Sequence, residues 1–435
     1  MRGGLSPCQL GCNRRTETCD QLLKDAKAKP RGVLGVFVLI LGLLVALPVS
    51  AAVAGDTRPN IVVLMIDDLA VLRDQRLWNR LPHIKSLFVD HGITFKHAIG
   101  ETSLCCPGRA GFLGGQHTRH HGVTYNDARL FDPTNTIATA LHDAGYTTLL
   151  SGKYLNLMDL LDNRFPPGWD HFAGIGDGYY DYDEFVDGVT IHHAHLPQDY
   201  STRVFRTQAL TWLRAAPAAQ PLFLYLPPFA PHGDPEDGFK PTGAPQDRGS
   251  SACWYLPPWK PPSYNEADVS DKPAWIAARP LLPYPNGWDL RRTCESMLAV
   301  DRMLAAVENE MAAQGRTDTL YLLVDDNGMD FGQHRLSGKT TPYSTPIPLM
   351  ASWSRRGLMQ RVETSYVSNI DIGPTLAEVA GTTMPQADGI SFAPLLTDQP
   401  WSPTRDAILI DMPPADAVPD RHNWSGLWTT DGHWL

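Results

Sequence analysis

The sequence contains few charges and lacks basic clusters outside its N-terminal region. Only 19% of its 435 residues are charged, and the formal net charge is −10. A surface that binds nucleic acid needs a positive stripe. The composition therefore excludes a nucleic-acid partner, and an anionic substrate would have to be held by a few focused cations.

The sequence also lacks internal repeats and low-complexity tracts. Their absence argues against a solenoid and against a disordered chain. A hydrophobic content of 43% is typical of a globular protein. At this length we expect one large domain and a smaller one.

One long apolar run, from Val33 to Leu47, lies near the N-terminus. Basic residues precede it, and small residues follow it at the spacing of a cleavage site. We therefore expect residues 1–54 to be a signal peptide with an N-terminal extension, and the mature protein to be secreted or held in the cell envelope. The alternative is an uncleaved membrane anchor, because the run is nearly long enough to span a bilayer. In either case this segment is the only expected membrane contact.

Cysteine is scarce, and only four of the seven cysteines follow this segment. Cys253 and Cys294 could form a disulfide bond outside the cytosol, but the sequence alone does not pair them. Cys105 and Cys106 are adjacent and need another explanation.

Four apolar segments are each followed by polar or ionisable residues. Residues 60–66, 146–150, 221–226 and 319–324 have the composition of buried strands, and helical patterns at 136–144 and 290–313 alternate with them. This alternation predicts a layered α/β fold, in which sites form at the carboxyl ends of the strands. The residues expected there are Asp67, Asp68, Lys153, His232, Asp326 and Asn327. A long proline-rich segment, 233–285, is expected to pass over the rim of this site.

The sharpest local signal is Ser103-Leu-Cys-Cys-Pro-Gly-Arg109. It can be a turn with buried thiols, but Cys105-x-Pro107-x-Arg109 is also the recognition pattern for oxidation of a cysteine to formylglycine. Here the sequence resembles the sulfatase family of the alkaline phosphatase superfamily. The other matching segments occur in the family's order after residue 57: Asp67-Asp68, Gly145 to Lys153, Pro231-His232, Asp326-Asn-Gly328, Asn369 to Thr375 and Asp388 to Ser391.

The resemblance implies a large, mixed, mostly parallel sheet flanked by helices, and a specific chemistry. A formylglycine made from Cys105 by a formylglycine-generating enzyme would hydrate and attack the sulfur of a sulfate ester. One Ca²⁺ ion would be held by hard oxygen ligands, since converging carboxylates repel one another without a cation. The implied metal ligands are Asp67, Asp68, the modified Cys105, Asp326 and Asn327.

The resemblance also assigns the cationic residues. Arg109, Lys153 and Lys339 would hold the sulfate oxygens and the nucleophile, although lysines are usually solvated surface charges. His232 would protonate the leaving alcohol, and His334 could assist at the rim.

Two details refine the resemblance. Lys153-Tyr-Leu-Asn156 and Pro261 to Ala267 resemble the N-acetylglucosamine-6-sulfatase branch, which points to a sulfated sugar or a related ester. Gly108 and Gly114 replace residues that are common in the family, and we expect them to weaken the helix that presents Cys105.

The alternative functions are a phosphodiesterase or phosphonate monoester hydrolase of the same superfamily, or an inactive secreted homologue.

The catalytic domain is expected to span residues 57–395, and residues 396–435 to begin a small antiparallel subdomain. The pattern 426–430 predicts a strand, and Asp431-Gly432 a hairpin turn. The return strand would then be only three residues long and would leave Trp428 and Trp434 uncovered. This pattern predicts an incomplete subdomain, and hence poor solubility or weak activity.

Overall fold

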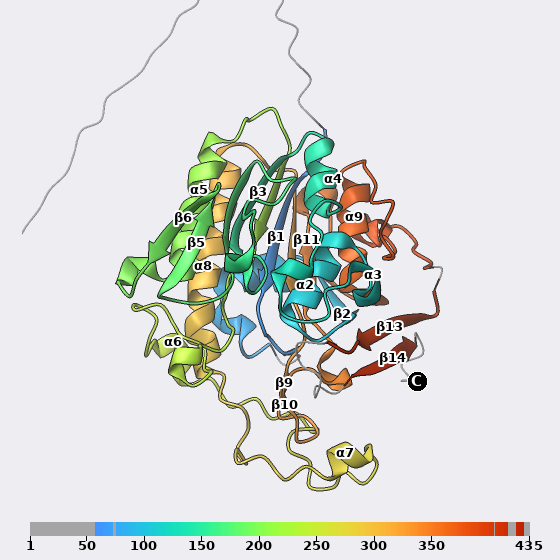
Figure 1. Ribbon diagram of the computed structural model, residues 1–435. Helices are drawn as coiled ribbons and strands as arrows, with labels where there is room; N and C mark the ends of the chain where they lie inside the picture. The colour runs from blue at the N-terminus through green and yellow to red at the C-terminus, as the bar shows by residue number, and fades with distance from the viewer. Residues whose placement is uncertain (1–56, 73–74, 404, 416–422, 430–435) are drawn as a thin grey trace, which may run out of the picture. The chain divides into compact units, whose positions relative to one another are not determined.

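The computed structural model describes residues 57–72, 75–403, 405–415 and 423–429. A ten-stranded sheet has the order β12-β2-β11-β8-β1-β7-β3-β4-β5-β6 (Figure 1). Its central strands, all parallel, are β8 (Thr319–Asp325), β1 (Asn60–Ile66), β7 (Leu222–Leu226), β3 (Thr147–Lys153) and β4 (His171–Ile175). The four strands expected from the sequence therefore lie side by side.

Antiparallel pairs at both edges make the sheet mixed. On one side β11 (Leu349–Ser352) runs antiparallel between β8 and β2 (Ile93–Ile99), and β12 (Arg361–Ser368) pairs in parallel with β2. On the other side β5 (Tyr182–Val186) and β6 (Val189–His193) continue beyond β4 as an antiparallel hairpin. The expected mixed, mostly parallel sheet is confirmed.

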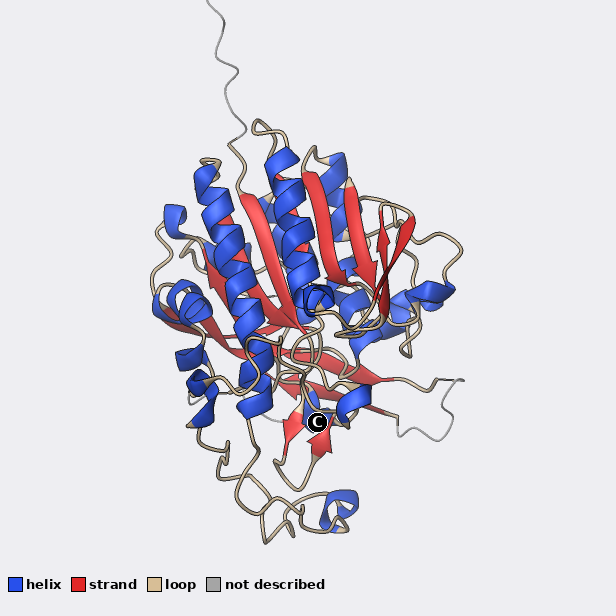
Figure 2. Cartoon of the chain, turned by 90° about the vertical axis from the view of Figure 1, so that its left-hand side faces the viewer, coloured by secondary structure: helices blue, strands red, loops and turns tan. Residues whose placement is uncertain are grey.

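Helices cover both faces of the sheet (Figure 2). Alternate side chains of β1 enter two separate cores: Val62, Leu64 and Ile66 join one, and the side chains between them join the other. This division is what a continuous apolar strand requires when both of its faces are buried. The first core contains α5 (Ser201–Ala215) and α8 (Arg291–Ala313), and the second contains α2 (Cys105–Gly114), α4 (Ile137–Asp143) and α9 (Ile372–Val379).

Several short elements connect this framework. They are α1 (Pro82–Ile84), α3 (Thr118–His121), α6 (Ser251–Trp254), α7 (Ala274–Ala277), α10 (Ala393–Leu396), β9 (Asp330–Phe331) and β10 (Ser337–Gly338). The segment between β7 and α8 carries α6 and α7, and α7 lies at the far end of an arm that projects from the sheet (Figure 1). The long excursion expected at 233–285 is therefore present.

A disulfide bond joins this excursion to the framework. Cys253 in α6 is bonded to Cys294 in α8, with a sequence separation of 41 residues. The pairing that the sequence left open is thus present, and it anchors α6 to the long helix behind the sheet.

Replacing both Cys253 and Cys294 with serine is expected to lower the free energy of unfolding. Closing a loop of this length removes denatured-state entropy corresponding to about 4 kcal/mol, and measured effects are typically about 2–4 kcal/mol. Urea unfolding of the oxidised wild type and of the double variant measures the difference. Reductant should destabilise the wild type and leave the variant unchanged, and equal stability of the two oxidised proteins would contradict the prediction.

The C-terminal part forms a separate antiparallel ribbon of β13 (Ala407–Met412) and β14 (Trp424–Thr429). The expected strand is present, but it pairs with the upstream β13, and residues 430–435 lie outside the described part of the chain. The expectation that Trp428 is uncovered is wrong. It is half-buried beside Ile408 and Ile410, and its indole N–H donates to Thr345 Oγ1 at 3.1 Å.

The expected targeting segment, with the apolar run 33–47, also lies outside the described residues. Within the ranges that are described, no helix is both long enough and apolar enough to cross a membrane.

Candidate active site

Four of the expected residues meet at the carboxyl ends of β1 and β8. The two strands are parallel neighbours with Ile66 opposite Asp325, so the residues that follow each strand reach the same edge of the sheet. Asp67 and Asp68 follow β1, Asp326 and Asn327 follow β8, and the side-chain amide of Asn327 donates to Asp68 Oδ1 at 2.6 Å. The register of one strand pair therefore brings these side chains together.

Cys105 is the first residue of α2 and points toward this edge. Its side chain is buried, and its Sγ lies 3.7 Å from Asp67 Oδ1. Gly108 explains how the helix comes so close: a Cβ at this position would lie 2.0 Å from the carbonyl oxygen of Asp326. The sequence-based expectation counted only the helix-weakening effect of Gly108, whereas the structure shows that its missing side chain lets α2 contact the β8 loop.

Three cations surround the cysteine and the acids. Lys153 Nζ lies 2.6 Å from Asp67 Oδ2, and Arg109 Nε lies 2.9 Å from Asp326 Oδ2. Lys339 Nζ lies 2.8 Å from Cys105 Sγ and 2.6 Å from Asp68 Oδ1. The lysines and the arginine that the sequence singled out are thus all in the cluster, and none is a solvated surface charge.

The position of Lys153 depends on the glycine before it. Gly152 has a φ of +145°, and a Cβ there would lie 2.2 Å from the carbonyl oxygen of Pro227. The Lys153 amide donates to the same carbonyl at 2.6 Å. Glycine therefore permits β3 to approach the end of β7 and directs Lys153 toward Asp67.

The two histidines have different positions. His232 is half-buried, with Nε2 3.3 Å from Asp68 Oδ2 and Nδ1 2.8 Å from the carbonyl oxygen of Gly233. Because a carbonyl only accepts, Nδ1 carries a proton and Nε2 faces the cluster. His334 instead lies beside Glu266 of the excursion, with 2.8 Å between Nδ1 and Oε2.

Comparison with known proteins gives this constellation a context. A family profile described as Sulfatase matches residues 59–382. The chain is 30% identical to the extracellular sulfatase SULF-1 homolog of Drosophila melanogaster over 79% of its own length and 32% of that protein. The chain belongs to the sulfatase family.

Other relatives agree with this assignment. An N-acetylglucosamine-6-sulfatase from Capra hircus is 27% identical over 84% of this chain and 68% of its own length. A structure in complex with D-glucosamine-2-N,6-O-disulfate aligns with a TM-score of 0.64 at 19% identity, over 87% of this chain and 90% of that one. A phosphonate monoester hydrolase from Silicibacter pomeroyi aligns with a TM-score of 0.62 at 20% identity, over 87% and 88%. These structural similarities confirm the expected fold class.

The buried carboxyl groups of this sulfatase-family site differ in their pKa values. Burial alone would raise the pKa of Asp67, but Lys153 and the other nearby cations outweigh it and hold that pKa well below its usual range. Burial and the charge of Asp67 raise the pKa of Asp326 to about 6. Burial also raises the pKa of the Cys105 thiol well above its usual value. Asp326 therefore ionises less readily than Asp67 within the same cluster.

Sequence reasoning assigned no role to Asp325. Its carboxylate is buried and accepts the backbone N–H of Leu69 at 2.7 Å and of Asp326 at 3.1 Å. It thereby connects the loop after β1 to the loop after β8. The sequence carried one signal for this role, because Asp325 is an acid at the end of an apolar strand, directly before Asp326.

The donor set of this sulfatase-family site fits a divalent cation. Asp326 Oδ1 is buried without a hydrogen-bond partner among the described atoms. Asp67, Asp68, Cys105 and His232 each offer an atom, and these four atoms lie within 4.8 Å of one another. His232 is in this group although the sequence gave it another role. A group dominated by carboxylate oxygens suits a hard cation such as Ca²⁺.

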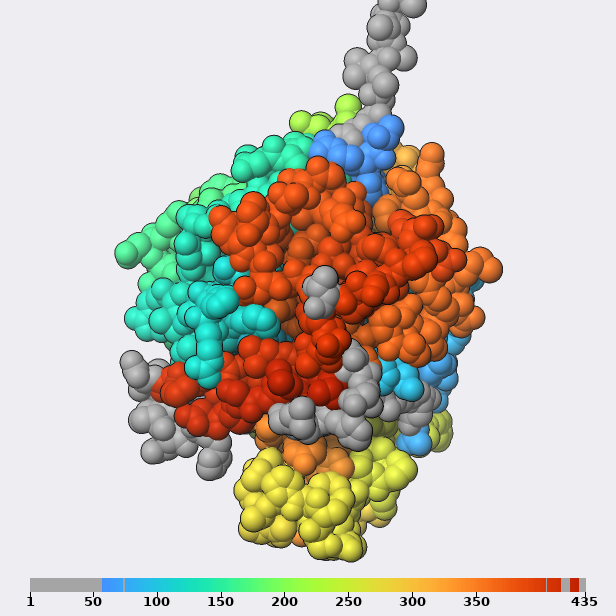
Figure 3. Space-filling view, turned by 90° about the vertical axis from the view of Figure 1, so that its right-hand side faces the viewer, coloured from blue at the N-terminus to red at the C-terminus, as the bar shows by residue number. Residues whose placement is uncertain are grey.

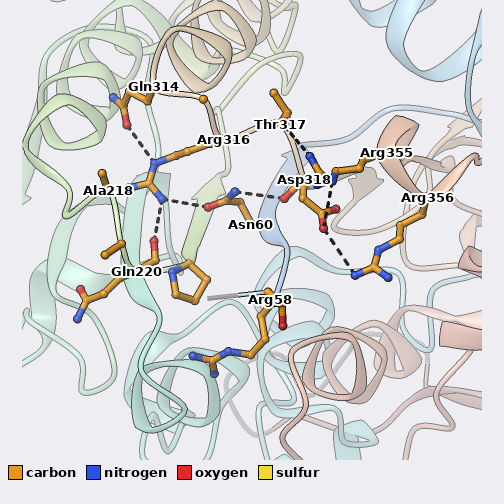
Figure 4. A pocket seen from close by; sticks show the side chains of 14 residues that line it. Arg58, Asn60, Ala218, Gln220, Gln314, Arg316, Thr317, Asp318, Arg355 and Arg356 are labelled. Atoms are coloured by element: carbon orange, nitrogen blue, oxygen red, sulfur yellow. Dashed lines mark hydrogen bonds and ion pairs between the residues drawn. The ribbon is translucent and has the colours of Figure 1, made fainter. Parts of the chain in front are cut away.

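A hollow of about 610 Å³ lies at the opposite end of β1 and β8 (Figure 4). Its arginines are largely committed to the fold: Arg316 donates to Asn60 Oδ1 at 3.0 Å, and Asp318 lies 3.6 Å from the guanidinium of Arg356. The length of β1, about 3.3 Å per residue, separates this hollow from the catalytic edge. It is therefore not part of the site.

Proposed function

We propose that this chain hydrolyses a sulfate ester, using a formylglycine made from Cys105 and one bound Ca²⁺ ion. The observation that carries the proposal is the surroundings of Cys105: its Sγ is buried 2.8 Å from Lys339 Nζ and 3.7 Å from Asp67 Oδ1. A cysteine with only a packing role has no need of such neighbours. A hydrated formylglycine would supply a nucleophilic oxygen at this position, and a Ca²⁺ ion held by the neighbouring acids would supply the charge that polarises a sulfate group.

The acidic residues would hold the cation, and the cationic residues would hold the anions. Asp67, Asp68, Asp326 and Asn327, with residue 105, form the proposed ligand set. Lys153, Arg109 and Lys339 are charged donors in a water-poor site, where they stabilise negative charge strongly. Arg109 is fixed for this purpose because its NH1 also donates to the carbonyl of Lys153 at 2.7 Å.

His232 would supply the proton for the leaving alcohol. Its Nδ1 is fixed by the Gly233 carbonyl, so Nε2 is the atom directed at the site. Nε2 lies 3.3 Å from Asp68 Oδ2, and an imidazole in this position can act as a general acid.

A sulfated sugar is the proposed substrate class. Two findings support it: the similarity to N-acetylglucosamine-6-sulfatases and the structural similarity to a protein solved with a disulfated glucosamine. We further propose that a formylglycine-generating enzyme matures the protein, and that the protein works outside the cytosol, either secreted or anchored through its N-terminal segment. The similarity to an extracellular sulfatase supports this location.

The rival function is hydrolysis of a phosphodiester or phosphonate monoester, which presents a similar tetrahedral anion. We expect the purified protein to have a kcat/KM for 4-nitrophenyl sulfate at least about tenfold above that for an aryl phosphodiester or phenyl phosphonate ester. Side-by-side initial rates in calcium-containing buffer measure the ratio, and Cys105→Ala controls for contaminating hydrolases. A larger kcat/KM for the phosphorus ester would overturn the proposed function.

A further inference from the structure

A cavity of about 510 Å³ opens from the proposed catalytic centre. Lys339 lines it, and the same ammonium lies 2.8 Å from Cys105 Sγ. The cavity and the proposed catalytic centre therefore share Lys339. Its volume falls within the range of about 300–1,000 Å³ found for sites that bind small molecules.

Two tryptophans from segments outside the large sheet line this cavity. Trp275, on α7, is 44% exposed, and its ring meets the edge of Tyr343 with 6.2 Å between centroids. Trp424, on β14, lines the cavity too, and its indole N–H donates to the carbonyl of Thr340 at 3.0 Å. Figure 3 shows the arm that carries α7 (yellow) projecting below the C-terminal ribbon (dark red). Fixed, partly exposed indoles are suitable surfaces for the apolar face of a sugar ring.

The cavity also contains an exposed cation, Arg279, which forms no close ion pair among the described residues, although its charge opposes the effect of burial, which raises the pKa of the Asp330 carboxyl. The guanidinium of Arg279 lies over the ring of Trp275, 5.6 Å from its centroid. Its backbone is fixed, because the carbonyl of Arg279 accepts a hydrogen bond of 2.7 Å from Arg335 NH1. Arg279 thus presents a positive charge over one face of the Trp275 indole, and the other face is the one available to a sugar ring.

We propose that this cavity binds the saccharide that carries the sulfate ester. A sugar ring lies against Trp275, and Arg279 binds a second anionic substituent, either a sulfate or a carboxylate. The substrate is therefore a saccharide with at least two anionic groups, one at the scissile ester and one beyond Lys339. This inference rests on the proposed function and adds a substrate requirement to it.

A neighbouring hollow of about 760 Å³ provides a control for the role of Arg279, because it contains a cation of its own. It contains Trp259, Lys260 and His334, but neither Lys339 nor Arg279. Tyr343 lines it as well, and this tyrosine also contacts the ring of Trp275. A cation in this hollow, such as Lys260, should not contribute to recognition of the second anionic group.

Substrate selectivity of the calcium-loaded protein tests the inference. The substrates are glucosamine 6-sulfate, glucosamine N,6-disulfate and a disaccharide of 6-sulfated glucosamine with a uronic acid. The measured quantity is the kcat/KM of each doubly charged substrate divided by that of glucosamine 6-sulfate. Arg279→Gln is expected to lower this ratio about tenfold for at least one of the two substrates, because one charge-assisted contact is lost. If the ratio falls for the disulfated sugar, the second anionic group is a sulfate; if it falls for the disaccharide, the group is a carboxylate. Trp275→Ala should raise KM for all three sugars more than it lowers kcat.

Matched variants serve as controls. Lys260→Gln removes a cation from the neighbouring hollow, and Trp254→Ala removes an exposed indole outside the cavity; both should retain the selectivity of the wild type. If Arg279→Gln leaves the ratios unchanged while the wild type hydrolyses the sugars, the inference is wrong and the proposed function stands. If Lys260→Gln instead changes the ratio of kcat/KM between doubly and singly charged sugars, the second anionic group binds in the neighbouring hollow and the inference is wrong. A wild type that hydrolyses no sulfate ester refutes both.

Discussion

Cys105→Ala is expected to abolish turnover, lowering kcat/KM for an aryl sulfate by at least about a thousandfold. Cys106→Ala is expected to keep most of the activity. Only Cys105 faces Lys339 and Asp67. The Cys106 thiol instead accepts the backbone N–H of Asn156 at 3.1 Å and lies in the core on one face of the sheet. Its loss should cost only about 1–2 kcal/mol of stability, through a small cavity.

Steady-state kinetics and thermal unfolding of both variants test this difference. Mass spectrometry of the wild-type peptide that contains Cys105 adds a chemical test, with an aldehyde expected in place of the thiol. A Cys105→Ala protein that unfolds at the wild-type temperature but is inactive supports the assignment. Equal loss of activity in the two variants would show that the cysteine pair acts structurally.

Asp326→Ala is expected to remove activity and the stabilisation by calcium together. The wild type should gain about 2.7 kcal/mol at a calcium concentration one hundred times its Kd, and the variant should gain almost nothing. The variant also removes the nearer carboxylate partner of the buried Arg109, at 2.9 Å, and leaves only Asp67 at 3.4 Å, so a buried ion pair is weakened. Its baseline stability should therefore fall as well.

Calcium titrations of the unfolding temperature separate these two effects. Loss of the Arg109 ion pair lowers Tm at every calcium concentration, whereas loss of a metal ligand removes the dependence of Tm on calcium. Chelation of the wild type should abolish turnover, and added Ca²⁺ should restore it. Full activity after exhaustive chelation would refute the proposed metal site.

The parts of the fold that were predictable are those specified by local pattern. The apolar segment 60–66 matches β1, and the amphipathic pattern at 290–313 matches α8 within one residue. The convergence of Asp67 and Asp326 followed from the rule that parallel strands end at a common edge. Local sequence was sufficient here because each signal lies within a single element.

The remaining features depend on contacts between distant segments. The antiparallel insertion of β11 between β8 and β2 follows from packing that no short pattern encodes. The contact of Gly108 with the Asp326 carbonyl, and the pairing of β14 with the upstream β13, are also long-range. For the same reason, the sequence could not show that Trp275, Arg279 and Trp424 line one cavity.

The burial of Cys105 sets the order of events that the proposed oxidation of its thiol would require during biosynthesis. Its side chain is 1% exposed, and every residue of α2 is buried in the folded protein. An enzyme that oxidises this thiol must therefore reach it before α2 docks against the β8 loop. Modification and folding then compete in time, and a chain that folds first keeps its thiol. Under the proposed function, the fraction of a preparation that carries formylglycine is accordingly determined by the relative rates of the two processes.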